Sequence, residues 1–399
     1  MTLLVFILLL FLHGLFSRRL EGTLITAPIL FTAAGFFLEP VLQLSDAVEN
    51  QSNVFLQLAE IGLVMLLFAD ASRTDLRVLK SIRALAVRLL SVGMLLTIVL
   101  GAGIALWIFP QLTIWEAGIL AAILAPTDAG LGQIIVNSPL VPERIRQSLN
   151  VEAGLNDGLS VPFLLFFMSL ASLHGDPEKA LGNFVVEQLG YGALLGAALG
   201  LLGGLLVQLA IERKWIAENY KQITLVVIPV LCLLLSEHFG ASMFIAAFVA
   251  GLFVQIRFKE AGKHSVEFTE EWGQLLNLSV FFLFGMLTFS YVGAIQLTHV
   301  FYAILSLTIV RMLPVGLALS GTGLQTSTKL FMGWFGPRGL ASIVLGLVFL
   351  EEELLIAGES TIRLSVITTV LLSIFAHGFS ATPGIQWYRR KLAIAKVEE

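Results

Sequence analysis

Apart from Glu116 at one end, three acidic residues lie inside two apolar segments that are each about the length of a membrane span. Residues 115–136 (WEAGILAAILAPTDAGLGQIIV) contain Asp128, and residues 148–172 (SLNVEAGLNDGLSVPFLLFFMSLAS) contain Glu152 and Asp157. A charged side chain at bilayer depth costs roughly 2.5–3.5 kcal/mol on insertion scales, so such residues persist mainly where they have a function. These acids are therefore the first candidates for the chemistry of this chain.

Asp157 is the acid whose surroundings allow an exchange reaction. Glu152 precedes it by five residues, which on a helix separates the two side chains by roughly 140°, so they need different partners. Arg311, in the middle of the apolar run LTIVRMLPV, is our predicted ion-pair partner for Glu152, and this leaves Asp157 without a cation. Such a buried carboxyl group can hold a proton or a dehydrated monovalent cation, but not both well. Competition between the two is the minimal mechanism of exchange; the alternative is a polar residue that only bridges helices.

Two apolar segments contain helix-breaking residues near their centres. Segment 115–136 contains APTD, and segment 327–350 contains GWFGPRG. A broken helix leaves N–H groups unpaired on one half and C=O groups unpaired on the other, and a membrane requires both to be compensated. We expect Thr127 and Asp128 to serve the positive ends in the first segment and Arg338 the negative ends in the second. Purely structural capping is the alternative for Asp128 and Arg338, and Thr127 could also offer an oxygen to an ion.

The composition predicts an all-α membrane protein with about 13 transmembrane helices. Of the 399 residues, 57% are hydrophobic and 13% are charged, whereas soluble proteins carry about 25% charge. The N-terminal run MTLLVFILLLFLHGLF is interpreted as a retained first span, because it lacks the features of a cleaved signal. Cys232 is the single cysteine, which excludes an intrachain disulfide, and no basic tail suggests nucleic acid as a partner. The predicted segments cover approximately residues 2–16, 24–38, 54–70, 84–108, 115–136, 148–172, 185–210, 221–237, 240–256, 272–292, 299–320, 327–350 and 362–387.

The basic residues predict how these segments cross the membrane. With thirteen spans, most of the 24 Lys and Arg residues fall in loops on one side, as the positive-inside rule requires. The C-terminus is then cytoplasmic and the N-terminus external, and we expect the membrane to be a bacterial inner membrane. The weakest division is the run SEHFG at 236–240; if it continues one helix, the count becomes twelve.

The two broken segments indicate an internal repeat. They occupy corresponding places if residues 1–172 and 221–387 form two six-segment units of inverted topology, with residues 185–210 as a connector and 388–399 as a short cytoplasmic tail. Broken spans in matching positions of two halves point to the binding site of a transporter.

Three further features carry smaller predictions. The charged stretch 257–271 is expected to form a cytoplasmic surface helix, and residues 71–83 a similar one. The stripe of small residues at Gly192, Gly196 and Gly200 indicates close helix packing. His377 could tune the broken segments, with simple helix packing as the alternative.

The motifs together resemble a known family. EAGLNDG, the preceding APTDA, the arginine within segment eleven, GPRG and AHGFSATP are similar to the monovalent cation:proton antiporter family, in its first branch. That branch includes prokaryotic sodium/proton antiporters and animal sodium/proton exchangers. The resemblance covers essentially the whole chain, and Asn-Asp, in place of the Asp-Asp of the electrogenic branch, is the mark of this branch.

The resemblance implies a role for each matching position. These are Asp157 as the cation- and proton-binding acid with Asn156 as its structural neighbour, Thr127 and Asp128 at the crossover, Glu152 with Arg311 as the core ion pair, and Asp70 where some members have an acid near the cation. Two positions depart from the family pattern. Ala129 replaces the usual Pro, which should loosen the crossover slightly, and Ala153 replaces a Ser whose hydroxyl contacts the cation. The ion shell is then one ligand short, and water or Asp70 could substitute.

The predicted function is therefore antiport of Na⁺, or of Li⁺ or K⁺, against H⁺, with Asp157 and Thr127 holding the cation. The resemblance implies one-for-one electroneutral exchange by a homodimer in membrane lipid, without a cofactor or enzymatic chemistry. It also implies that segments 4–6 and 11–13 move against a scaffold. The alternatives are a potassium/proton antiporter, a channel-like cation protein, and an intramembrane aspartyl protease using two of Asp70, Asp128 and Asp157. The protease would need Tyr-Asp and Gly-x-Gly-Asp signatures, and neither occurs.

Overall fold

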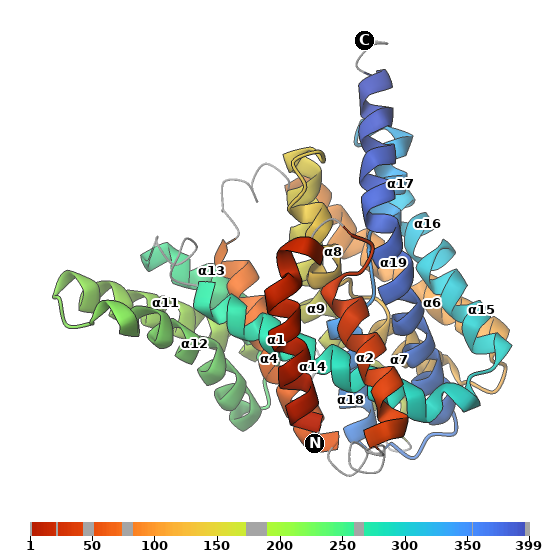
Figure 1. The fold of residues 1–399 in the computed structure, drawn as a ribbon, viewed down its shortest axis with the longest axis horizontal. Coiled ribbons are helices and arrows are strands. Elements are labelled where there is room, and N and C mark those ends of the chain that lie inside the picture. Colours follow the sequence, from red (N-terminus) through yellow and green to blue (C-terminus); the bar gives the residue numbers. More distant parts are fainter. Residues whose placement is uncertain are drawn as a thin grey trace.

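All regular secondary structure in the described part of the chain is helical, as predicted for an all-α protein (Figure 1). The computed structural model describes residues 2–20, 23–42, 52–73, 83–172, 190–258, 267–352 and 354–395. In Figure 1 the N-terminus and the C-terminus lie at opposite ends of the bundle, and α11 and α12 form an arm to one side.

Each predicted segment coincides with one described helix or with a pair of shorter helices. The N-terminal elements are α1 (Thr2–Leu20), α2 (Ala27–Leu42), α4 (Ser52–Arg73), the π-helical turn η1 (Leu89–Gly93) with α6 (Met94–Ile108), α7 (Ile114–Ile123), α8 (Ala129–Val136) and α9 (Glu143–Ala171). The later elements are α11 (Gly192–Glu212), α12 (Glu218–Phe239), α13 (Met243–Arg257), α14 (Glu267–Tyr291), the 3₁₀ turn η3 (Val292–Ala294), α15 (Leu297–Leu307), α16 (Ile309–Ala318), α17 (Thr326–Trp334), α18 (Leu340–Glu351) and α19 (Glu359–Ala395).

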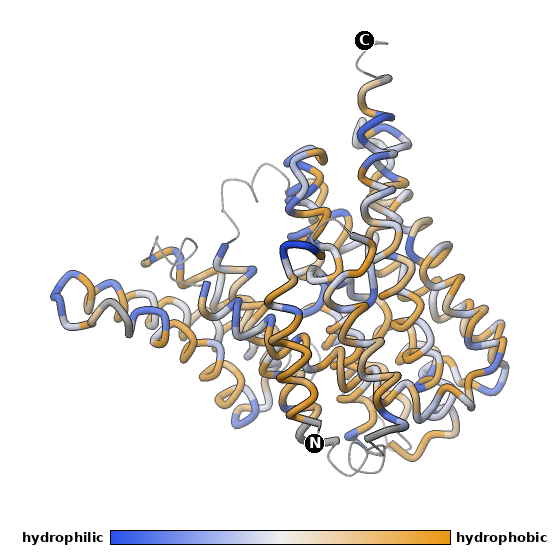
Figure 2. Tube along the Cα trace, in the orientation of Figure 1, coloured by the Kyte–Doolittle hydropathy of each residue, from blue (hydrophilic) through white to orange (hydrophobic). Residues whose placement is uncertain are grey.

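The helices have the length and surface of membrane spans. Within the described ranges, nine are long and apolar enough to cross a bilayer, and four shorter apolar helices, which correspond to α2, α7, α13 and α18, accompany them. Figure 2 shows hydrophobic residues along the helix lengths, and large side chains such as Leu4 and Phe11 on α1 and Leu206 on α11 are exposed. Exposed apolar faces of this kind suit contact with lipid.

The short connection at residues 236–240 separates two helices. Gly240 ends α12 with a φ of 62°, a left-handed conformation that glycine adopts without strain, and Ser242 caps α13 by accepting a hydrogen bond from the Ile245 N–H at 3.3 Å. The chain therefore turns here, and the prediction of two segments is confirmed over the prediction of one long helix.

The glycine stripe of α11 packs against α13 of the same chain. A Cβ atom built on Gly196 would lie 2.9 Å from the Ala246 Cα, and one built on Gly200 would lie 2.8 Å from the Ala250 Cα. Only glycine allows the two backbones to approach so closely, so the predicted close packing is confirmed as an intrachain contact.

Two helical regions differ in continuity from what their local sequence suggests. Gly154, Gly158 and Pro162 do not break α9, which is continuous from Glu143 to Ala171. A helical glycine costs only about 1 kcal/mol, whereas unpaired backbone groups in an apolar surrounding cost several, so the helix continues through it. The predicted apolar segment 299–320 is divided at Thr308 into two helices, α15 and α16.

The predicted surface helices fall largely outside the described residues. Residues 259–266 and 74–82 are not described, while residues 267–271 form the first turns of α14 and residues 71–73 end α4.

Candidate functional site

The two broken segments cross each other at the centre of the structure. The backbone N–H of Asp128 donates to the carbonyl of Pro337 at 2.8 Å, which joins the stretch between α7 and α8 to the stretch between α17 and α18. Both predicted breaks are therefore present, and they lie in contact. Four half-helix ends meet at this crossing, two with unpaired N–H groups and two with unpaired carbonyls.

Asp128 serves both N-terminal ends. Its Oδ1 accepts from the Leu131 N–H in the first turn of α8 at 3.0 Å, and its Oδ2 accepts from the Leu340 N–H at the start of α18 at 2.5 Å. One carboxylate thus compensates two positive helix ends, one from each broken segment. The neighbouring Gly339 must lack a side chain, because its Cβ would overlap the Asp128 carboxylate.

Arg338 compensates the opposite end of the other segment, which corrects the sequence prediction. We expected it to serve its own segment; instead its Nη1 donates to the carbonyls of Ala125 at 2.7 Å and Pro126 at 2.9 Å, just beyond α7. The reason is its place beside the crossing at Pro337, where these carbonyls are the unpaired acceptors within reach. The guanidinium is completely buried, so its charge is held by these helix-end carbonyls.

His377 serves the fourth end. Its Nε2 donates to the Trp334 carbonyl, the last residue of α17, at 2.9 Å. Its Nδ1 lies 3.1 Å from the Ser373 hydroxyl oxygen, which accepts from the Arg338 backbone N–H at 2.6 Å. Two side chains of α19 therefore hold the break between α17 and α18. The signal in the sequence was that His377 follows Ser373 by one helical turn, and this spacing did not identify the Trp334 carbonyl as the partner.

The predicted ion pair between Glu152 and Arg311 is present. Arg311 Nη1 on α16 lies 2.5 Å from Glu152 Oε1 on α9, and the residues are only 4% and 2% exposed. Gly336 leaves room for the guanidinium, since a Cβ there would overlap it. Within the described residues, Arg311 Nε and Nη2 have no further partner, so Glu152 alone balances this charge.

Asn156 on α9 forms hydrogen bonds with Thr127, in the stretch between α7 and α8 where the two broken segments cross. Its Oδ1 accepts from the Thr127 N–H at 3.2 Å, and its Nδ2 donates to the Thr127 hydroxyl oxygen at 2.9 Å. Both polar groups of the amide are occupied, so Asn156 positions Thr127. The hydroxyl oxygen of Thr127 keeps a second lone pair, which remains available to an ion.

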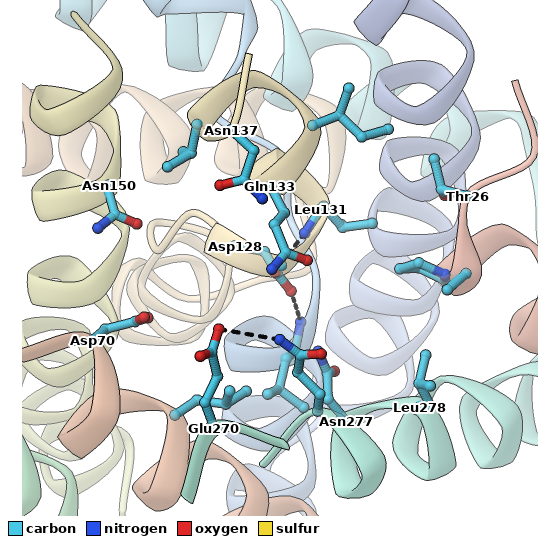
Figure 3. A pocket seen from close by; sticks show the side chains of 18 of the residues that line it. Thr26, Asp70, Asp128, Leu131, Gln133, Asn137, Asn150, Glu270, Asn277 and Leu278 are labelled. Carbon is cyan, nitrogen blue, oxygen red and sulfur yellow. Dashed lines mark hydrogen bonds between the residues drawn. The ribbon is translucent and has the colours of Figure 1, made fainter. Parts of the chain in front are cut away.

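Asp157 differs from the other buried acids. It is 8% exposed, forms no ion pair in the part of the chain that the structure describes, and its Oδ1 has no hydrogen-bond partner there. It lines a cavity of about 760 Å³. Asp70 and Asp128, both labelled in Figure 3, line the same cavity. The structure therefore places three predicted site acids around one cavity.

The same cavity is lined by residues that the sequence did not single out. Glu270, Gln274 and Asn277 reach it from α14, and Glu270 forms an ion pair with Arg73 at the end of α4. Asn277 Oδ1 is buried without a partner among the described residues. An amide in the apolar run LLNLSVFF was the available signal.

Comparison with known proteins identifies relatives. The family model described as "Sodium/hydrogen exchanger, transmembrane" matches residues 5–387. The chain is 27% identical over 364 residues to the Na(+)/H(+) antiporter of Schizosaccharomyces pombe, covering 78% of this chain and 72% of that protein. It is 25% identical over 351 residues to the K(+)/H(+) antiporter NhaP of Alkalimonas amylolytica, covering 85% of this chain but only 58% of that protein.

A solved structure has the same fold. The sodium proton antiporter MjNhaP1 from Methanocaldococcus jannaschii at pH 8 matches with a TM-score of 0.80 and 22% sequence identity. The match covers 98% of this chain and 99% of that one. This chain therefore shares its overall fold with that protein.

Proposed function

The chain belongs to the sodium/hydrogen exchanger family, and on that premise we propose that it exchanges a monovalent cation for a proton at Asp157. It is an integral membrane transporter and not an enzyme, which removes the protease alternative. The observation that carries the proposal is the buried Asp157 carboxyl group, which faces a cavity without a basic partner in the described structure. Asp128, by contrast, is engaged by two backbone N–H groups, and Glu152 by Arg311.

The proposed reaction is competition at one carboxyl group. Protonated Asp157 is neutral; once the proton leaves through the cavity, the carboxylate attracts a monovalent cation, and Asp70 adds negative charge near the same cavity. Thr127, held by Asn156, would supply an oxygen to the ion. Since one proton and one cation carry the same charge, loading either leaves the site equally charged, and exchange would be one-for-one and electroneutral.

The residues that line the cavity support a cytoplasmic opening. It is lined by Ser17 and Leu20 at the end of α1, by Arg73 at the end of α4 and by Glu270 at the start of α14. Arg18, Arg19 and Arg73 lie at these helix ends, and under the positive-inside rule they support a cytoplasmic position for them. The state that we propose for this structure is therefore the cytoplasm-facing one. Access would alternate by movement of a core made of α6–α9 and α15–α19 against a scaffold that includes α4 and α14, within a homodimer.

Sodium is the proposed cation and potassium is the second candidate. The fission yeast relative is named as a Na(+)/H(+) antiporter, while several bacterial relatives are named as K(+)/H(+) antiporters. Ala153 offers no hydroxyl near Asp157, so the residues of α9 alone do not decide between the ions.

The test is the substitution Asp157→Asn in everted vesicles or proteoliposomes with an imposed pH gradient. Addition of Na⁺, K⁺ or Li⁺ should dissipate the gradient in the wild type and identify the ion. Asp157→Asn should insert normally and abolish the response. Glu143→Gln, an exposed acid in the first turn of the same helix, serves as the matched control and should exchange normally.

Exchange retained by Asp157→Asn would refute Asp157 as the carrier. Cation flux that proceeds without any proton movement would instead indicate a channel.

A further inference from the structure

Asn277 is a buried amide on α14. The residue is 8% exposed, and within the described residues no hydrogen-bond donor reaches its Oδ1. Leaving a buried carbonyl oxygen without a donor is costly, so unpaired acceptors of this kind are rare in native proteins. A buried acceptor of this kind suits a cation or a hydrogen-bond donor that enters from the neighbouring cavity.

The surroundings of Asn277 indicate the nature of that occupant. Asn277 lines the same cavity as Asp128 and Asp157, reaching it from a different helix (Figure 3). A Cβ built on Gly130 would lie 3.0 Å from Asp128 Oδ1 and 3.2 Å from Asn277 Nδ2, so the amide reaches the start of α8 beside the crossover. Asp157 Oδ1 is a second buried acceptor that lacks a donor in the described structure. These two oxygens lack a donor among the described residues, and four carboxylates line the cavity, those of Asp70, Asp128, Asp157 and Glu270. Such a lining suits a cation.

We propose that Asn277 Oδ1 is a ligand of the transported monovalent cation, together with the Asp157 carboxylate, in the cytoplasm-facing state. The proposal rests on the exchange function proposed for Asp157. Hard cations bind carboxylate and amide carbonyl oxygens, and an amide adds a ligand without adding charge. Asn277 would therefore complete a shell to which Ala153 contributes no oxygen, while one carboxylate still balances one cation.

The location of Asn277 makes this ligand specific to one side of the membrane. Asp157 lies on α9 in the proposed core, whereas Asn277 lies on α14 in the proposed scaffold. When the core moves, Asp157 carries the cation away from the amide, and the ion loses a ligand as it reaches the external side. Cation affinity would then be higher on the cytoplasmic face than on the external face.

The experiment compares two faces and three variants. The KM for Na⁺ and for K⁺ is measured in everted vesicles, which expose the cytoplasmic face, and in right-side-out vesicles. A pH-sensitive dye reports the rate of exchange as each cation is added. Asn277→Leu removes the side-chain oxygen that is proposed to bind the cation, whereas Asn277→Asp keeps an oxygen at that place. Ser279→Ala is the control. Ser279 lies on the same helix, but its hydroxyl already donates to the Leu276 carbonyl at 2.6 Å.

Asn277→Leu should raise the KM for the exchanged cation about tenfold at the cytoplasmic face, as expected for one lost contact to a charged group. The KM at the external face, and both KM values of Ser279→Ala, should stay at the wild-type level. Asn277→Asp should remain closer to the wild type than Asn277→Leu at the cytoplasmic face. If Asn277→Leu fails to insert, Asn277→Ala is measured with the same expectation.

An unchanged cytoplasmic KM would overturn the proposal, and so would an equal rise on both faces, which indicates a structural role. Failure of the exchange function itself would be recognised separately: the wild type would show no exchange, or Asp157→Asn would retain it.

Discussion

The ion pair between Glu152 and Arg311 allows a quantitative test of its structural role. We predict that Glu152→Met and Arg311→Met each lower the free energy of unfolding by about 3–5 kcal/mol, because each leaves one buried charge uncompensated. The geometry supports the upper part of this range for Glu152→Met. Arg311 has a single acidic partner at 2.5 Å, and its Nε and Nη2 have no other partner in the described residues.

The double variant Glu152→Met/Arg311→Met should recover most of that loss and fall within about 1 kcal/mol of the wild type, because it removes both charges and keeps the volume filled. Equilibrium unfolding of the purified protein in a denaturing detergent measures all three variants. Glu359→Gln is the control, since it breaks a partly exposed pair between residues four positions apart, Glu359 and Arg363, and should cost no more than about 1 kcal/mol.

The reasoning fails if the two single losses simply add in the double variant, because additive losses would mean that the two charges do not compensate each other. Exchange activity provides a second check. The double variant should still exchange a cation for a proton, because Asp157 and its cavity are untouched.

Three further outcomes follow from the packing and the crossover. Gly200→Leu should prevent close packing of α11 on α13 and abolish the monodisperse peak in size-exclusion chromatography, whereas Gly103→Leu, where a Cβ meets nothing within 4 Å, should give the wild-type profile. Asp128→Asn should lower the free energy of unfolding by about 2–3 kcal/mol in the same detergent titration, because an NH₂ group replaces one of two oxygens that accept from backbone N–H groups. His377→Leu should cost about 1–3 kcal/mol by leaving the Trp334 carbonyl unpaired, and His377→Gln should lose less; equal losses would argue against the hydrogen bond.

The helices and both breaks could be predicted because their signals are local. A run of apolar residues long enough for a bilayer is visible in the sequence, and so are Pro126 and Pro337 within such runs. Glycine is a weaker signal, because α9 continues through Gly154 and Gly158. A glycine weakens a helix by about 1 kcal/mol, which does not outweigh hydrogen bonds that no water can replace.

The partners at the crossover could not be predicted because they depend on which ends face each other. Both broken segments expose N–H groups and carbonyls, so the sequence alone allows Arg338 to serve either one. In the folded protein the Asp128 N–H bonds to the Pro337 carbonyl, which brings the two broken segments together. Arg338, the next residue, then reaches the carbonyls of Ala125 and Pro126. Asn277 was missed for a similar reason, since its helix approaches Asp128 only in the folded protein.

The exchange of caps between the two broken segments has a consequence for biosynthesis. Ala125, Pro126 and Asp128 receive their partners from residues 337–340, which are translated more than 200 residues later. Until the twelfth segment has left the ribosome, the first half of the chain carries unpaired backbone groups that lipid cannot solvate. Its fifth segment must therefore wait in a hydrated environment, such as the insertion machinery, and final packing of both halves occurs late and together.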